Sequence, residues 1–329
     1  TGEIFAGAGF GSSGGTIGGG VKENNFLGRG VKLDANIQFS ETAIRGKFSV
    51  VNPNYNYSGN EIRFTAESTK TSKMTTFGYD SNKTGFSLGT TFEQYEDIFI
   101  SPAVSTYYES LSTNDNASTA LKQQEGTYID TELRYSVIQD KRDQSFKPTE
   151  GYRASFNQKL PLYSESPSLI NGIDYSAYHS FSDNFIGSLR FHGRAINSLS
   201  SSEDVKLSER LSIPGRYLRG FEVGKIGPVD ASDYIGGNYV TALGFNAALP
   251  KLLPNLTNAD VSLFLDTGNV WGIDYDTNID ESNKLRSAFG VSVDWFTPIG
   301  PLSFSFSEAI TSASTDKPES FRFNIGTTF

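Results

Sequence analysis

The side chains that could do chemistry are few in this 329-residue chain. It has no cysteine, which excludes a thiolate nucleophile, a thiolate metal site and a disulfide framework. His179 and His192 are the only imidazoles, and this argues against a histidine-built metal centre. Ser212 and the glycine spacings around it lack the strand-to-helix context that nucleophile and phosphate motifs require. We therefore expect no catalytic residue, no metal and no cofactor.

The charge balance restricts the partners. With 28 Lys+Arg and 37 Asp+Glu the net charge is -9, which argues against a nucleic-acid partner because a phosphate backbone needs a basic face. Acidic residues gather at 93–97 and again at 274–281. Both groups are interpreted as solvated surface, and loop-bound calcium is a remote alternative.

The elements that must position the remaining polar groups are strands. Apolar and polar side chains alternate over residues 31–40, 129–137, 289–295, 302–307 and 321–329. A period of two indicates a strand with one apolar and one polar face. We find no stripe of helical length with a 3.6-residue period. The chain is therefore predicted to be all-β.

About sixteen such segments of roughly ten residues use about half of the chain, the ratio expected of a transmembrane barrel. The predicted strands lie near 3–11, 15–23, 30–40, 43–52, 60–71, 82–92, 98–111, 127–138, 151–160, 171–181, 185–198, 236–249, 259–268, 285–296, 301–310 and 320–329.

The connections favour a membrane barrel over a soluble sandwich or propeller, which would show the same alternation. Alternate links are short, as at 182–184, whereas many of those between them are long and polar, as at 113–126, 200–235 and 273–284. The link at 40–42 is an exception: it is tight, although the alternation of short and long links would place a long loop there. Short turns at one end and long loops at the other are typical of outer-membrane barrels.

The polar faces of the strands also favour a membrane barrel. Arg190, His192 and Arg194 share one face of a strand whose other face carries Leu189 and Phe191. A soluble core would not accept a row of cations, whereas a water-filled lumen would. No apolar run approaches the roughly 18 residues of a membrane-spanning helix, which excludes a helical membrane protein. No basic-then-apolar segment begins the chain, so we expect a mature or truncated piece.

Specific motifs resemble one family. They are S-I-P-G-R-Y-L-R-G-F-E-V-G-K-I-G-P at 212–228, F-L-D-T-G-N-V-W at 264–271, F-T-P-I-G-P-L at 296–302, F-R-F-N-I-G-T-T-F at 321–329 and G-V-K-E-N-N-F-L-G-R-G at 20–30. Together and in this order they resemble the C-terminal barrel of the outer-membrane protein assembly factor superfamily, and the resemblance covers essentially the whole chain.

The resemblance implies an integral protein of the bacterial outer membrane that inserts other β-barrel proteins. Its partners would be unfolded outer-membrane protein clients, the lipid bilayer and accessory assembly lipoproteins. The lipoproteins would bind through the periplasmic POTRA domains of the family, which we expect to be missing from residues 1–329. We therefore expect residues 1–329 to form a single transmembrane barrel domain.

The long loop at 200–235 is predicted to fold back into the lumen. Asp266 lies opposite the apolar face of its predicted strand and points inward, where Arg219 can pair with it through two hydrogen bonds. The alternative is an ordinary solvated arginine. The family places an acidic residue where Asn246 stands, which implies a less negative cluster here. The loop-motif residues are Arg216, Leu218, Arg219, Gly220 and Phe221.

Glycine marks a second candidate site. Eleven of the 33 glycines lie within residues 1–30, and glycine inside a strand costs packing and entropy. The seam between the first and last strands is therefore predicted to be weak, and an exposed strand edge is a template for adding another strand. The resemblance implies that this seam acts as a lateral gate whose edge pairs with a client strand. The alternative is that these glycines only allow curvature. The seam residues are Ile4, Ala6, Gly7, Gly9, Phe323, Ile325, Gly326 and Phe329.

Two other functions stay open at this point. A sister translocator of the same superfamily would export a partner polypeptide through the lumen. A passive porin would leave the lumen open and conduct a large steady current.

Overall fold

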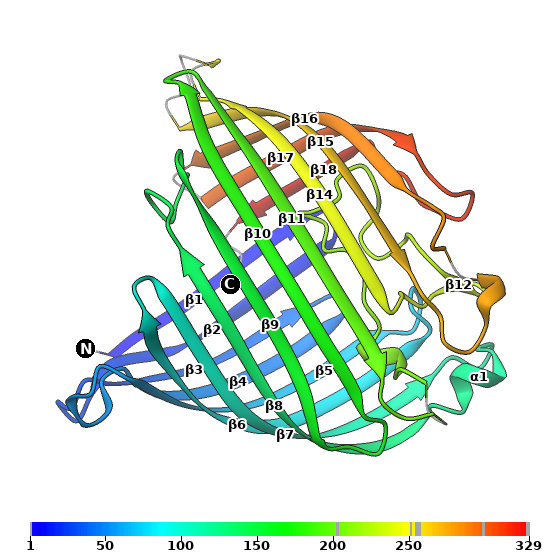
Figure 1. Ribbon diagram of the computed structural model, residues 1–329, viewed down its shortest axis with the longest axis horizontal. Coiled ribbons are helices and arrows are strands. Elements are labelled where there is room, and N and C mark those ends of the chain that lie inside the picture. Colours follow the sequence, from blue (N-terminus) through cyan, green and yellow to red (C-terminus); the bar gives the residue numbers. More distant parts are fainter. Residues whose placement is uncertain are drawn as a thin grey trace.

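The structure is a computed structural model that describes residues 2–201, 204–250, 252–253, 258–279, 281–297 and 300–326. Sixteen antiparallel strands close into one barrel, and only β12 and β13 stand apart as a two-stranded ribbon (Figure 1). The predicted all-β, sixteen-stranded fold is confirmed. The barrel strands are β1 (Gly2–Gly11), β2 (Gly14–Phe26), β3 (Val31–Ser40), β4 (Ala43–Asn52), β5 (Glu61–Lys73), β6 (Tyr79–Tyr95), β7 (Ile98–Thr113), β8 (Gly126–Asp140), β9 (Gly151–Tyr163), β10 (Ser168–Ser182), β11 (Phe185–Ser198), β14 (Tyr239–Leu249), β15 (Ala259–Trp271), β16 (Arg286–Thr297), β17 (Gly300–Thr311) and β18 (Phe321–Gly326).

The strand ends differ from the sequence prediction at several places. β14 begins at Tyr239 rather than near residue 236, because Gly237 instead exchanges backbone hydrogen bonds with Leu211. β15 continues to Trp271 rather than ending near 268. The predicted last strand extended to Phe329, which lies outside the described residues.

Short elements decorate the connections. They are the helix α1 (Thr119–Lys122), the 3₁₀ turns η1 (Tyr55–Tyr57), η2 (Leu207–Glu209) and η3 (Thr277–Ile279), and the ribbon β12 (Val229–Asp230) with β13 (Asp233–Tyr234). The long connections 114–125, 199–238 and 272–285 all meet at one end of the barrel, opposite the N-terminus (Figure 1). No helix in the described part of the chain is long and apolar enough to cross a membrane.

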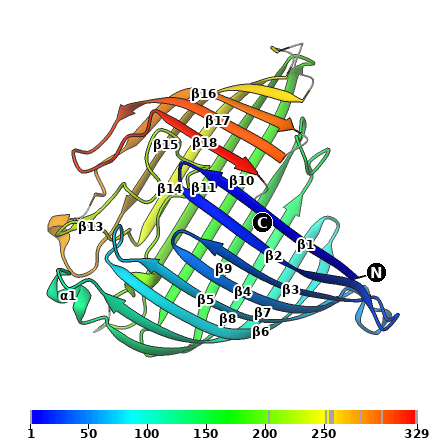
Figure 2. The ribbon, with the colours of Figure 1, turned by 180° about the vertical axis from the view of Figure 1, so that it is seen from behind.

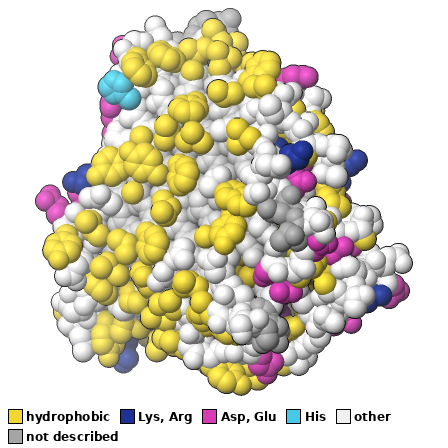
Figure 3. Space-filling model, turned by 45° about the vertical axis from the view of Figure 1, so that its right-hand side comes forward, with side chains coloured by type: hydrophobic (Ala, Val, Ile, Leu, Met, Phe, Trp, Pro, Cys, Tyr) yellow, Lys and Arg dark blue, Asp and Glu magenta, His cyan; other side chains and the backbone are white. Residues whose placement is uncertain are grey.

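The outer wall carries the apolar faces of the strands. On neighbouring strands β16 and β17, Phe289 is 51% exposed and Phe306 57% exposed, whereas Ser305 and Ser307 of β17 are buried on the inner side. Figure 3 shows hydrophobic side chains spread across the wall, with charged ones mostly toward its margins. A surface this apolar indicates that lipid is the solvent of the outer wall.

The buried apolar residues gather inside the barrel at the loop end. One cluster joins Leu218 and Phe221 of the 199–238 connection to Val240, Val270 and Ala288 of the wall. A second cluster contains Tyr79, Leu111, Ala117, Leu121, Leu207, Ile235 and Ile273, and so joins β6, β7, α1 and two long connections. The long connections thus pack on one another and on the inner wall.

Candidate functional site

The 199–238 connection, called the luminal loop below, runs inside the barrel. Figures 1 and 2 show its yellow-green trace between the walls formed by β14–β18 and by β1–β5. Ile213, Leu218 and Phe221 are each less than 4% exposed, because they pack against inward-facing side chains of the wall. Burial of this apolar surface holds the loop in the lumen.

Arg219 is the polar anchor of the luminal loop. Its Nε donates to Asp266 Oδ2 at 2.6 Å and its Nη2 to Asp266 Oδ1 at 2.8 Å, while its backbone N–H also donates to Oδ2 at 3.0 Å. Nη2 donates further to Asn246 Oδ1 at 2.7 Å. The guanidinium lies 3.6 Å from the ring centroid of Phe264. Arg219 and Asp266, which the sequence analysis paired, are therefore brought together, and Asn246, at the position where the family has an acidic residue, joins them.

Gly220 allows the loop to approach the wall. Its φ is +89°, and a Cβ at this position would lie 2.5 Å from the Cβ of Ala288. A larger residue would be strained in backbone and would collide with β16. Of the other motif residues, Leu218 and Phe221 are buried, whereas Arg216 is exposed to the lumen and stacks over the ring of Tyr217 at 4.9 Å.

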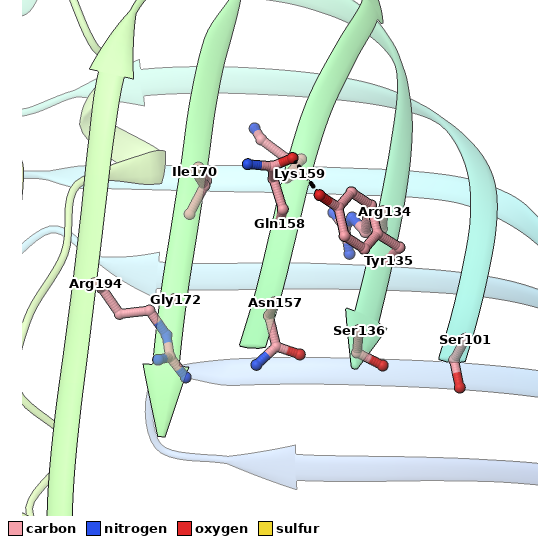
Figure 4. Close-up of a pocket in the computed structure, with 10 residues that line it drawn as sticks. All are labelled: Ser101, Arg134, Tyr135, Ser136, Asn157, Gln158, Lys159, Ile170, Gly172 and Arg194. Carbon is pink, nitrogen blue, oxygen red and sulfur yellow. Dashed lines mark hydrogen bonds between the residues drawn. The ribbon is translucent and has the colours of Figure 1, made fainter. Parts of the chain in front are cut away.

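The inner wall beside this anchor is polar. His192 Nδ1 lies 2.7 Å from Asp174 Oδ1, and Arg194 donates to the other oxygen of Asp174 at 2.5 Å. Tyr217 of the loop stacks on His192 at 4.4 Å between ring centroids. Figure 4 shows Arg194 with Asn157 beside a lumen cavity of about 230 Å³. The row of cations predicted to face water therefore does face the lumen.

Lys206 forms a second anchor that sequence reasoning missed. It is 2% exposed, and its Nζ donates to Asp130 Oδ2 at 2.5 Å and to Glu109 Oε2 at 3.4 Å, across to β8 and β7. Burial alone would lower the pKa of Lys206, but Glu209, Glu109 and Asp130 outweigh this and raise it above the ordinary value. The sequence contains one local signal, a lysine between Val205 and Leu207, but the partners of this lysine lie 97 and 76 residues away along the chain.

Replacing Lys206 by Met is expected to destabilise the docked loop by about 3 kcal/mol, because Glu109 and Asp130 would keep buried charges without their cation. The unfolding temperature in detergent measures this. Lys225→Met is the matched control, since Lys225 belongs to the same loop but pairs with Glu222 at the surface and should lose less than about 1 kcal/mol. Equal losses in the two variants would contradict the anchor.

Glu209 extends this anchor toward β9 and β10. It accepts from Ser168 Oγ at 2.6 Å and pairs with Lys159. Burial raises the pKa of Glu209, but Lys159, Lys206 and the hydrogen bonds prevail and lower it from 4.5 to about 2. Because the folded pKa lies below the unfolded one, the stabilisation is complete above pH 4.5 and is lost as the pH falls toward 2.

A pH titration of stability is therefore predicted for Glu209→Gln. The variant should be less stable than the native chain by about 3 kcal/mol at pH 7, and the difference should stay constant to about pH 5 and vanish toward pH 2. Comparing unfolding temperatures of the two proteins at each pH isolates this carboxyl from all the others. Glu222→Gln, exposed on the same loop, is the control. A difference that has already vanished at pH 5 would contradict the low pKa.

The seam between β1 and β18 has three register pairs within the described residues, which end at Gly326. These pairs are Gly9 with Gly326, Phe10 with Ile325, and Gly11 with Asn324, whereas all of β1 from Gly2 to Gly11 is in register with β2. Past the end of β1, the backbone N–H of Ser12 donates to the carbonyl of Phe323 at 2.9 Å. Figure 2 shows the two strands meeting.

The predicted seam residues are only partly brought together. Ile4, Ala6 and Gly7 have no β18 partner within the described residues, and Ile4 is 88% exposed. Gly326 has a φ of +102°, and a Cβ there would lie 2.9 Å from the Cα of Gly9. Only glycine fits this approach of the two strands.

These features define a class of protein, an integral outer-membrane β-barrel whose lumen holds its own longest loop. Comparison with known families is consistent with it: residues 25–329 match the Omp85 superfamily domain. The chain belongs to the Omp85 superfamily and is an integral protein of the outer membrane.

Among curated relatives, the chain is 26% identical over 220 residues to outer membrane protein assembly factor BamA of Neorickettsia risticii, an alignment covering 65% of this chain and 29% of that protein. It is 26% identical over 226 residues to BamA of Neisseria meningitidis, covering 58% and 28% respectively. The chain thus spans less than a third of the length of these relatives.

Solved structures agree on the fold. BamA from Haemophilus ducreyi lacking POTRA domains 1-3 superposes with a TM-score of 0.91 at 23% identity, covering 100% of this chain and 70% of that one. CdiB from Acinetobacter baumannii is more distant, with a TM-score of 0.59 at 13% identity over 99% of this chain and 60% of that one. The barrel is therefore similar in structure to the BamA barrel.

Proposed function

We propose that this barrel inserts β-barrel proteins into the outer membrane, with the seam acting as a lateral gate. The observation that carries the proposal is the contrast between the two edges of β1. One edge is in register with β2 along its whole length, whereas the other is in register with β18 over Gly9–Gly11 within the described residues, which end at Gly326. An unpaired strand edge is a template for a further strand. The relatives named above, which are outer membrane protein assembly factors, support the same function.

The mechanism needs neither nucleotide nor metal. A client strand would pair with the open edge of β1, and each hydrogen bond formed there would satisfy a backbone group before it enters lipid. Closure of the client barrel and burial of its apolar face supply the free energy. The immediate partners are unfolded outer-membrane protein clients and the bilayer. Binding of accessory lipoproteins through POTRA domains stays a prediction.

Reconstitution tests the proposal. Liposomes containing the chain should fold an unfolded eight-stranded client about fivefold faster than empty liposomes, as measured by the gel shift of folded barrels. Liposomes containing an unrelated porin are the control for lipid defects. Equal rates in the three preparations would contradict an assembly function.

Two further readouts separate the alternatives. A secretion translocator would leave the client protease-accessible on the far side of the membrane rather than inserted in it. A porin would show a large steady single-channel conductance, whereas a lumen filled by the loop should pass little current.

A further inference from the structure

The luminal loop is attached to the segment that leads into the last strand. The backbone N–H of Glu222 donates to the carbonyl of Lys317 at 2.9 Å, and that of Glu319 donates to the carbonyl of Gly220 at 2.9 Å. Phe221 and Pro318 form an antiparallel bridge between them. The loop and residues 317–319 thus make a short ladder inside the barrel.

Arg322 extends this ladder into β18 itself. It is the first inward-facing residue of the strand and is 8% exposed. Its Nη1 donates to the carbonyl of Gly215 at 2.9 Å, its Nη2 donates to the carbonyl of Phe221, and its Nε donates to Glu319 at 2.8 Å. One side chain of the last strand therefore holds two separate carbonyls of the luminal loop.

The loop consequently bridges two distant strands. Arg219 fastens it to Asp266 on β15, while the carbonyls of Gly215 and Phe221 on either side of Arg219 are fastened to β18. Between these attachment points lie β16 and β17. The sector β15–β18 is thus tied together from inside, and β1 lies just beyond the tie, across the seam.

The other attachments of β18 are described as far as Gly326. Within that part, β18 is in register with β17 between Phe321 and Ile325, and with β1 at Asn324, Ile325 and Gly326. Arg322 adds three donor bonds to these strand pairings. Because Arg322 lies one residue from Phe323, a seam residue, loss of its bonds acts directly on the seam.

We propose that Arg322 is a positioning residue that transmits the docked state of the luminal loop to β18, so that undocking of the loop loosens the last strand and the seam. The biological role of this coupling rests on the proposed assembly function. The coupling itself is a property of the chain alone, because it links two anchors, Arg219 and Arg322, within one polypeptide. A planar guanidinium is required, because it reaches both carbonyls and Glu319 at once, whereas an amide or ammonium does not.

Hydrogen exchange measured by mass spectrometry, on the purified chain in detergent without any client, tests the coupling. Four proteins form a cycle: the native chain, Arg219→Lys, Arg322→Gln and the double variant. Amides of β18 should exchange about fivefold faster in Arg322→Gln, because opening of the strand becomes easier. Arg219→Lys alone should accelerate exchange of the β18 amides about threefold relative to the native chain. In the Arg322→Gln background, adding Arg219→Lys should cause no further acceleration.

The controls keep the result interpretable. Arg45→Gln removes an arginine from β4, a strand paired with β3 and β5, and should leave β18 unchanged. Peptides from β9 should exchange at the native rate in every variant, which shows that the barrel is folded. Arg322→Lys, which keeps the charge opposite Glu319, should behave like Arg322→Gln.

Two outcomes would overturn the proposal. One is an unchanged β18 in Arg322→Gln, and the other is an equal effect of Arg219→Lys in both backgrounds. Since no client is present, a failure here leaves the liposome assembly test untouched, and a failure of the assembly test leaves this coupling untouched.

Discussion

A disulfide between cysteines placed at Phe10 and Ile325 is expected to reduce client assembly by about tenfold or more, because it prevents β1 and β18 from separating to open the gate. The two positions are direct register partners across the seam, so their Cα atoms lie within disulfide reach. The native chain has no cysteine, which makes the pair chemically unique. Assembly in liposomes before and after oxidation is the measurement.

The matched control is a second pair, at Ile17 and Phe39, which are register partners on β2 and β3 and are exposed on the outer wall. This bond should leave assembly unchanged, because the β2–β3 pairing has no role in the gate. Reduction with dithiothreitol should restore the seam variant. Full activity of the oxidised seam variant would contradict the lateral gate, whatever the behaviour of the control.

Arg219→Ala is expected to destabilise the barrel with its docked loop by about 3 kcal/mol, because Asp266 would stay buried and charged with only Arg190, at 4.0 Å, as a described cation nearby. Asp266 is fully buried, and Arg219 supplies three of the hydrogen bonds it accepts. One of these comes from the backbone and survives the substitution. The unfolding temperature in detergent and protease sensitivity of the loop are the measurements.

Two further variants test whether the loss of stability comes from the pairing with Asp266. Arg219→Lys keeps a charge but not the two-pronged pairing, and should lose about half as much stability. Arg216→Ala removes a neighbouring arginine that faces the lumen, and should lose less than about 1 kcal/mol. A loss in Arg216→Ala as large as in Arg219→Ala would show that the loop depends on general positive charge rather than on the pairing with Asp266.

The fold was predictable because each strand carries its own signal. In β17, Leu302, Phe304 and Phe306 alternate with serines, and no distant residue is needed to recognise a wall with lipid on one side. Strand ends were less predictable, as at Gly237, which pairs with Leu211 of the loop instead of extending β14. Tertiary hydrogen bonds overrode the local pattern there.

The site residues also fall into a group that was predictable from the sequence and a group that was not. Arg219 and Asp266 could be paired in advance because a motif singled them out and strand alternation put the carboxylate inside. Lys206 lies in none of the motifs, and Arg322 lies in the motif at 321–329 without a role assigned to it. Lys206 resembles any loop lysine, and Arg322 any polar residue on the inner face of a strand. Their roles depend on which groups stand opposite them across the lumen.

By itself, the sequence determined that strands of alternating character build a barrel and which face of each strand meets water, because the polarity of each side chain is a local property. Only the tertiary structure decided that β1 pairs with β18 from Gly9 to Gly11 in the described part of the chain, and that one loop ties β15 to β18. Those contacts depend on the register summed around sixteen strands, and a shift of one residue anywhere would exchange the partners.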